Sequence, residues 1–230
     1  MNKKYKHYSF DLWGTLIKSN PKFKQVRAEY FAQNFNRNGL KIEEVAKVFE
    51  NISLMCDAVD DVINIPIDAF QMYTIALQQL NYDISLLTQR DILAIYNVVE
   101  TNFLRHHPVL FDENTENVLK QLKSSGATLS ILSNTAYAKG HSIKKVLDKL
   151  GISQYFTFML FSDEIRISKP NHVAFSALKD AVMHYRTFTP IETSEIVHIG
   201  DNDRADGASK SAGIDSIIIN SNSKRIKDLL

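Results

Sequence analysis

Short runs of hydrophobic residues occur in the two outer parts of the chain. The run Tyr8-Ser9-Phe10-Asp11 has the length and composition of a buried strand, and a glycine-containing turn follows it. Similar runs predict strands at 128–132, 157–161, 196–199 and 216–219. Between these runs, apolar residues recur at helical spacing over 114–125, 140–150 and 171–185. Strands that alternate with helices predict an α/β fold, with a parallel sheet covered by helices on both faces.

The middle of the chain has a different pattern. Between the first strand and the helix at 114, the apolar spacing predicts only helices, over 21–36, 42–55, 69–80 and 88–104. Thr88-Gln89-Arg90-Asp91 resembles a capping box at the start of the last of these. We therefore expect a core formed by residues 1–17 and 108–230, and an inserted helical domain, the cap, formed by residues 18–107. Its hinges are expected near 17–19 and 106–108.

Charge and cysteine content narrow the class of protein. The 230 residues include 27 basic and 26 acidic side chains, so no global field attracts nucleic acid or an anionic membrane. The single cysteine, Cys56, excludes an internal disulfide framework. No apolar run approaches the ~18 residues of a membrane span. We expect a cytoplasmic enzyme or binding protein that acts on a small molecule. Nothing in the sequence indicates an oligomeric state.

Polar residues follow several of the predicted strands. Because ligands of open parallel sheets bind beyond the carboxyl ends of the strands, these residues are candidates for one site. They are Asp11, Ser133, Asn134, Lys169, Asp201 and Asp206. Each alone is also compatible with a helix cap, a turn residue or a solvated lysine. Together they suit phosphoryl transfer: a carboxylate nucleophile, oxygen ligands for Mg²⁺, and a lysine and a serine that hold phosphoryl oxygens.

The same residues form four ordered motifs. These are D-x-x-G-T-L at Asp11, Gly14, Thr15 and Leu16, then S-N at Ser133 and Asn134, K-P at Lys169 and Pro170, and G-D-x4-D at Gly200, Asp201 and Asp206. They resemble the motifs of the haloacid dehalogenase (HAD) superfamily, over essentially the whole chain.

This resemblance implies a Rossmann-like core with a helical cap of the first type. It also implies that Asp11 is the nucleophile and that Asp11, Asp201 and the backbone carbonyl of Trp13 bind Mg²⁺, with Asp206 acting indirectly or through water. Lys169 and Ser133 are the other expected catalytic residues. The expected phosphate- or substrate-binding residues are Ser133, Asn134, Lys169, Gly14 and Thr15.

Trp13 departs from the phosphatase pattern of this family, which has a second aspartate two residues after the nucleophile. An indole cannot transfer protons at neutral pH, and general acid–base catalysis is typically worth ~10²–10⁴-fold in rate. Three interpretations are open. The first, which the intact Gly200-Asp201-x4-Asp206 motif favours, is a Mg²⁺-dependent phosphatase of small phosphorylated metabolites. The second is a 2-haloacid dehalogenase-like hydrolase, and the third is a binding protein that has lost turnover.

Other residues have plainer interpretations. Trp13 is expected to pack between core and cap, and Cys56 to be buried and inert. Near the first hinge, the cap carries basic residues that form either a solvated helix face or a binding site for a second anionic group of the substrate. They are Lys18, Lys22, Lys24 and Arg27. Five histidines are expected to be structural or exposed, namely His106, His107, His141, His172 and His198.

Overall fold

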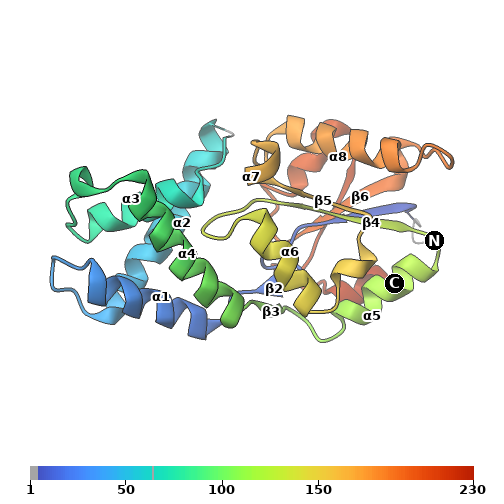
Figure 1. Ribbon diagram of the computed structural model, residues 1–230. Helices are drawn as coiled ribbons and strands as arrows, with labels where there is room; N and C mark the ends of the chain where they lie inside the picture. The colour runs from blue at the N-terminus through green and yellow to red at the C-terminus, as the bar shows by residue number, and fades with distance from the viewer. Residues whose placement is uncertain (1–4, 64) are drawn as a thin grey trace.

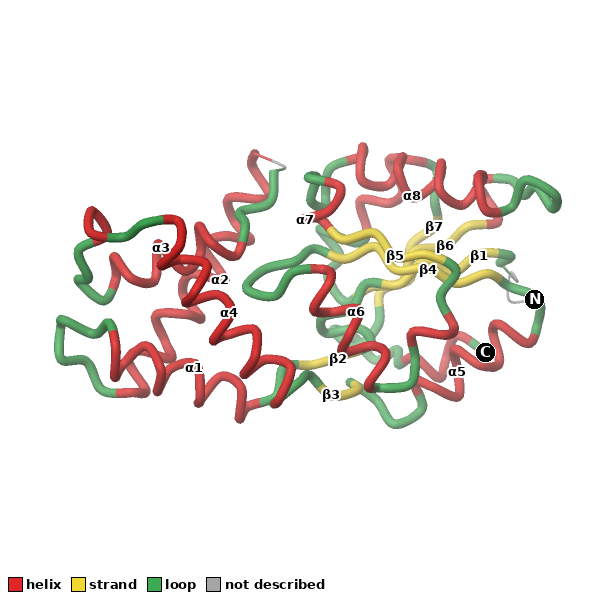
Figure 2. The backbone as a smooth tube through the Cα atoms, in the orientation of Figure 1, coloured by secondary structure: helices red, strands yellow, loops and turns green. Residues whose placement is uncertain are grey.

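A parallel sheet forms the centre of the core. The structure is a computed structural model that describes residues 5–63 and 65–230. Within these residues, five parallel strands form one sheet in the order β5-β4-β1-β6-β7, and the sheet lies in the middle of the core in Figures 1 and 2. The strands are β1 (His7–Phe10), β4 (Thr128–Ser133), β5 (Phe158–Phe161), β6 (Ile196–Gly200) and β7 (Asp215–Ile218). The predicted α/β fold is confirmed.

Helices cover both faces of this sheet. On one face, β1 and β4 pack against the helices α5 (Thr115–Ser124) and α6 (Gly140–Lys149) and against the 3-10 turn η5 (Ile226–Leu229). On the other face lie α8 (His172–Tyr185) and the 3-10 helix η4 (Gly207–Ala212). The remaining short elements of the core are α7 (Ser162–Ile165), η2 (Ser153–Tyr155) and η3 (Thr193–Glu195). The described residues contain no helix that is both long and apolar enough to cross a membrane.

The inserted segment forms a separate helical cluster beside the carboxyl ends of the strands (Figure 1). It consists of α1 (Pro21–Asn34), α2 (Ile42–Ile63), α3 (Ala69–Gln79), η1 (Ile84–Leu86) and α4 (Gln89–Arg105). The expected end of the second helix at Met55 was wrong, because α2 continues to Ile63. Acidic residues interrupt its hydrophobic pattern after Met55 in the sequence, yet Ala58, Val59 and Val62 continue the helical spacing.

Local sequence signals set several of the helix ends. The side chain of Asn20 accepts a hydrogen bond from the backbone N–H of Lys22, and Pro21 occupies the first turn of α1. Thr88 and Asp91 form the expected capping box of α4. Gly126 follows α5 with φ of +88°, a left-handed conformation that glycine adopts without strain.

Several contacts join the cap to the core, including that between α4 and α6, and two of them bear on the domain division. The first is a short antiparallel ladder between β2 (Ile17–Lys18) and β3 (Val109–Leu110), at the two points where the chain crosses over. The second is Tyr137, a core residue that packs within the hydrophobic cluster of the cap. A division into a core of residues 1–17 and 108–230 and a cap of residues 18–107 remains a proposal, and this arrangement supports it.

Candidate active site

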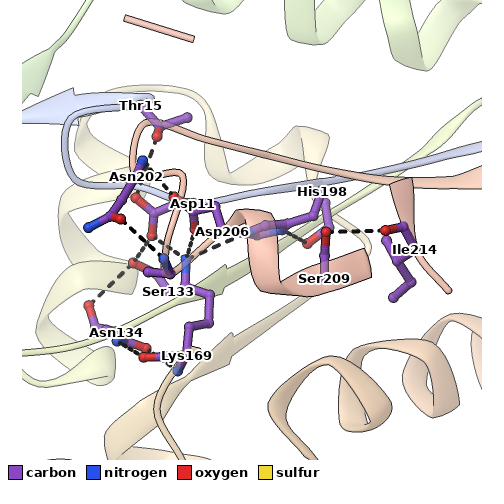
Figure 3. Close-up of polar contacts among 12 residues, drawn as sticks. Asp11, Thr15, Ser133, Asn134, Lys169, His198, Asn202, Asp206, Ser209 and Ile214 are labelled. Atoms are coloured by element: carbon purple, nitrogen blue, oxygen red, sulfur yellow. Dashed lines mark hydrogen bonds and ion pairs between the residues drawn. The ribbon is translucent and has the colours of Figure 1, made fainter. Parts of the chain in front are cut away.

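The expected site residues come together where three neighbouring strands end. Asp11 directly follows β1, Ser133 is the last residue of β4, and Asp201 directly follows β6. Because β4, β1 and β6 are adjacent and in parallel register, their carboxyl ends lie side by side. Lys169, from the loop between α7 and α8, reaches the same point (Figure 3).

Asp11 is held by two donors on one of its oxygens. Its Oδ1 accepts hydrogen bonds from Ser133 Oγ at 2.9 Å and from Lys169 Nζ at 2.9 Å. Its Oδ2 lies 3.5 Å from Thr15 Oγ1. The carboxyl group is therefore fixed in orientation, with Oδ2 much less engaged than Oδ1 by the described residues.

Lys169 links Asp11 to a second buried carboxylate. Its Nζ lies 2.6 Å from Asp206 Oδ1. Asp206 also accepts a hydrogen bond from the backbone N–H of Asn202 through Oδ2, at 3.0 Å. Both Lys169 and Asp206 are almost completely buried. Both oxygens of Asp206 are therefore engaged, one by Lys169 and one by the backbone of Asn202. This arrangement supports an indirect contribution of Asp206 to metal binding.

Asp201 brings a third carboxylate to the site. One oxygen each of Asp11, Asp201 and Asp206 lie within 4.8 Å of one another, a grouping able to hold a metal ion. Glycine at position 14 makes this approach possible, because a Cβ there would lie 2.2 Å from Asp201 Oδ2. Gly14 also has φ of +74°, which favours glycine.

The charges of the group do not balance. When all three carboxylates are ionised they contribute −3 and the ammonium of Lys169 contributes +1, so the group of described residues then carries −2. Such buried charge needs a compensating cation or a proton. The residues present therefore suit a divalent, oxygen-binding metal.

The pKa values follow from burial and from these neighbours. Burial raises the pKa of Asp11, although the ammonium of Lys169 acts in the opposite direction. Burial and the nearby carboxylate of Asp206 both raise the pKa of Asp201. Burial also opposes ionisation of Asp206, but Lys169 and His198 outweigh it and hold the pKa of Asp206 below its usual range. For Lys169, burial is outweighed by its two carboxylate partners, which raise its pKa. Lys169 is consequently a fixed cation rather than a proton donor.

Asn134, an expected phosphate- or substrate-binding residue, makes two hydrogen bonds to the backbone of Lys169. Its Nδ2 donates to the backbone carbonyl of Lys169, and its Oδ1 accepts from the backbone N–H of Lys169, both at 2.8 Å. The amide therefore clamps the loop that carries the lysine (Figure 3). Asn134 thus holds Lys169 in place, and its expected contact with the substrate stays a prediction.

Trp13 lies at the junction of core and cap. Its partly buried side chain packs against the hydrophobic clusters of both. No hydrogen bond between described residues ends on the Trp13 carbonyl oxygen, which leaves this oxygen available as a metal ligand. The packing position expected for the indole agrees with the structure.

Some residues of the site were missed in the sequence. His198 was expected to be structural or exposed; it is buried, and its Nε2 lies 3.0 Å from Asp206 Oδ1, while its Nδ1 lies 3.0 Å from Ser9 Oγ. Burial and Lys169 lower the pKa of His198. Asn220, after β7, donates from Nδ2 to the carbonyls of Gly14 at 2.8 Å and Thr15 at 3.2 Å. The local sequence around Asn220 does not indicate this contact with Gly14 and Thr15.

The seam between cap and core was also not foreseen. Tyr137 donates from its hydroxyl to the carbonyl of Phe49 at 3.0 Å, and Tyr73 donates to the carbonyl of Tyr137 at 3.3 Å. The guanidinium of Arg27 lies 4.2 Å from the ring centroid of Phe49 and 4.4 Å from that of Tyr137. Of the basic residues near the first hinge, Arg27 is buried at this seam, whereas Lys18, Lys22 and Lys24 are exposed.

Comparison with known proteins places the chain in a family. The sequence profile of the haloacid dehalogenase-like hydrolases matches residues 5–213. The chain belongs to this family. It is also similar to (S)-2-haloacid dehalogenase 2 of Pseudomonas sp. (strain CBS-3), with 37% identity over 57 residues. That match spans only 25% of this chain and 24% of the relative.

The solved structures that share this fold carry names that refer to different reactions. YfnB from Bacillus subtilis, bound to magnesium, superposes with a TM-score of 0.73 at 16% identity, covering 96% of this chain and 92% of that one. A predicted phosphoglycolate phosphatase from Haemophilus somnus 129pt gives 0.64 at 19% identity, covering 95% and 86%. L-2-haloacid dehalogenase from Xanthobacter autotrophicus gives 0.60 at 15% identity, covering 94% and 77%. At sequence identities of 15–19%, these structural similarities support the fold of this HAD hydrolase but do not show which reaction it catalyses.

Proposed function

We propose that this HAD hydrolase is a Mg²⁺-dependent phosphatase that acts on a small phosphorylated metabolite through an aspartyl-phosphate on Asp11. One observation carries the proposal: three carboxylates converge on a single ammonium, which leaves an excess charge of −2. An anionic phosphate ester is repelled by such a site unless a divalent cation is bound there. Displacement of a halide needs no metal ion. That reaction therefore does not explain why a third carboxylate, Asp201, lies in the site.

The residues that would hold Mg²⁺ are Asp11, Asp201 and the carbonyl of Trp13, with Asp206 acting through Lys169 or a water molecule. When bound, the ion neutralises the carboxylates and the phosphoryl oxygens so that nucleophile and substrate can approach. Lys169 and Ser133 orient Asp11 through Oδ1, so Oδ2 is the oxygen free to attack phosphorus. Both side chains also provide donors to the phosphoryl oxygens.

The reaction then proceeds in two displacements. Oδ2 of Asp11 forms a bond to phosphorus while the bond from phosphorus to the leaving oxygen breaks, and the leaving group departs with that electron pair. Water next attacks phosphorus, which releases inorganic phosphate and regenerates the Asp11 carboxylate. Trp13 supplies no proton to the leaving oxygen, a loss of about 3–5 kcal/mol in barrier. We therefore expect acyl and aryl phosphates, whose leaving groups are stable anions, to be the better substrates.

A 2-haloacid dehalogenase-like reaction is the second candidate. It is favoured by the similarity to (S)-2-haloacid dehalogenase 2 and by the aromatic residue at position 13, because a halide leaves without a proton. In that reaction Asp11 attacks carbon, and water then hydrolyses the resulting ester.

Hydrolysis assays separate these candidates. A panel that includes an aryl phosphate, acetyl phosphate and alkyl phosphates is assayed with Mg²⁺ and with a chelator, using Asp11→Asn as the blank. We expect Mg²⁺-dependent phosphate release that is absent from the blank and falls steeply toward alkyl phosphates. Halide release from 2-haloacids in the presence of chelator contradicts the phosphatase. If the folded protein turns over neither class, the interpretation as a catalytically impaired binding protein replaces it.

A further inference from the structure

A cavity that is open to solvent lies on the core domain, outside the polar contacts of the Asp11 site. It has a volume of about 210 Å³ and opens between β1, β7 and the turn η5. Its walls are formed by the rings of Tyr5 and Tyr8 and by apolar side chains of β7 and η5, with charged groups at the rim. The rim residues are Lys224, Arg225 and Asp228.

The walls suit a flat, apolar group. The rings of Tyr5 and Tyr8 stand edge to face, with centroids 5.9 Å apart and an interplanar angle of 85°. Ile217 and Leu229 complete the apolar lining. Because pockets for drug-sized ligands hold ~300–1,000 Å³, a cavity of about 210 Å³ has room for a single ring.

The rim suits an anion. Two cationic side chains and one carboxylate give it a charge of +1, and the Asp228 carboxylate already accepts a hydrogen bond from the backbone N–H of Arg225, at 2.7 Å. Among residues 5–63 and 65–230, no acceptor lies within hydrogen-bonding or ion-pair distance of the Lys224 ammonium. That ammonium is available to a ligand.

The cavity is connected to the catalytic turn through the backbone. The carbonyl of Lys224 accepts a hydrogen bond from the backbone N–H of Asn220 at 2.9 Å. The side chain of Asn220 in turn holds the carbonyls of Gly14 and Thr15. Gly14 is the residue that lies against Asp201. A movement of residues 220–225 is therefore transmitted through Asn220 to Gly14 and Thr15, in the turn that follows Asp11 and lies against Asp201.

We propose that this cavity binds a small aromatic carboxylate with a single ring, and that its occupancy displaces the Gly14–Thr15 turn through Asn220. The ring lies against Tyr5 and Tyr8, and the carboxylate pairs with Lys224. The site is separate from the hydrolytic reaction, so the proposal stands or falls independently of the function proposed above.

Titration of the isotope-labelled full chain with benzoate, followed by backbone amide shifts, tests the proposal. We expect saturable shifts at Tyr5, Ile217 and Lys224 with a Kd on the order of 1 mM, as for other ligands of this size. Lys224→Met should weaken binding about fivefold, whereas Lys227→Met, which changes an exposed lysine of the adjacent turn η5 that does not line the cavity, should leave it unchanged. Benzyl alcohol, which has the ring without the charge, should bind as weakly to the wild type as benzoate does to Lys224→Met.

The coupling is tested in the same titration. Benzoate should shift the amides of Gly14 and Thr15 in the wild type. Asn220→Gly keeps the left-handed backbone of this position, whose φ is +66°, but removes the amide; in this variant benzoate should bind normally while the shifts at the turn disappear. No saturable shift at the cavity, equal binding of benzyl alcohol, or unchanged binding by Lys224→Met overturns the site. Saturation without shifts at Gly14 and Thr15 overturns the coupling.

Discussion

Replacing Asp201 by asparagine should make the metal-free protein more stable. Asn keeps the shape of the side chain and its ability to accept a hydrogen bond from Thr15, but it removes one of the three converging negative charges. With carboxylate oxygens within 4.8 Å of one another, Coulomb's law at an effective dielectric constant of ~20 gives about 3.5 kcal/mol of repulsion per pair. Because Asp201 is only half-buried, solvent screens the repulsion, and we expect a gain of about 1–2 kcal/mol.

The assay is denaturant-induced unfolding in chelator and in excess Mg²⁺. The wild type should gain about 2.7 kcal/mol when Mg²⁺ is present at 100 times its Kd, whereas Asp201→Asn should gain little. Asp203→Asn is the matched control, because Asp203 is an exposed aspartate of the same turn, and it should behave as the wild type in both conditions. If Asp201→Asn is less stable than the wild type in chelator, or keeps the full Mg²⁺ gain, the charge argument is refuted.

Three further predictions concern the indole, a buried histidine and the seam. Trp13→Asp should raise turnover of alkyl phosphates by ~10²-fold or more relative to Trp13→Phe, measured as kcat/KM with Mg²⁺, provided circular dichroism shows both variants folded; equal rates would contradict the missing-acid argument. Burial lowers the pKa of His7 from 6.5 to about 3, so below pH 6.5 the unfolded chain binds a proton that the folded chain does not. Stability should therefore fall by about 2 kcal/mol from this group between pH 8 and pH 5, and His7→Asn should lose that part of the pH dependence in urea unfolding. Tyr137→Phe should lower the free energy of unfolding by about 1 kcal/mol through loss of the bond to Phe49, whereas Tyr155→Phe, whose hydroxyl contacts Glu116 at the surface, should change it little.

The sheet and its alternation with helices were predictable because each strand is a short apolar run bounded by turn residues. The convergence of Asp11, Ser133 and Asp201 followed as well, since parallel strands bring their carboxyl ends to one edge. Lys169 was harder to place, because it lies in a loop, and only its position before Pro170, between a strand and the next helix, together with the family motif indicated the site.

Other features depend on long-range packing that local patterns do not encode. His198 occupies an ordinary position in an apolar strand, and its contact with Asp206 depends on how η4 folds back on β6. Arg27 lies four residues after Phe23 and four before Phe31, on the buried face of α1, but its contact with Tyr137 depends on how this core residue enters the cap. Asn220 is separated from Gly14 by almost the whole chain. Such contacts require the folded topology.

The central claim is that Asp11 forms a covalent bond to phosphorus. Its most direct test is one turnover of an aryl phosphate with Mg²⁺ in heavy-oxygen water, followed by acid quench and mass spectrometry of the peptide that contains Asp11. The account predicts a peptide that transiently carries one phosphoryl group, and heavy oxygen that ends in inorganic phosphate with none in the Asp11 carboxylate. Phosphate release without a modified Asp11 peptide, or heavy oxygen incorporated into Asp11 itself, would contradict it.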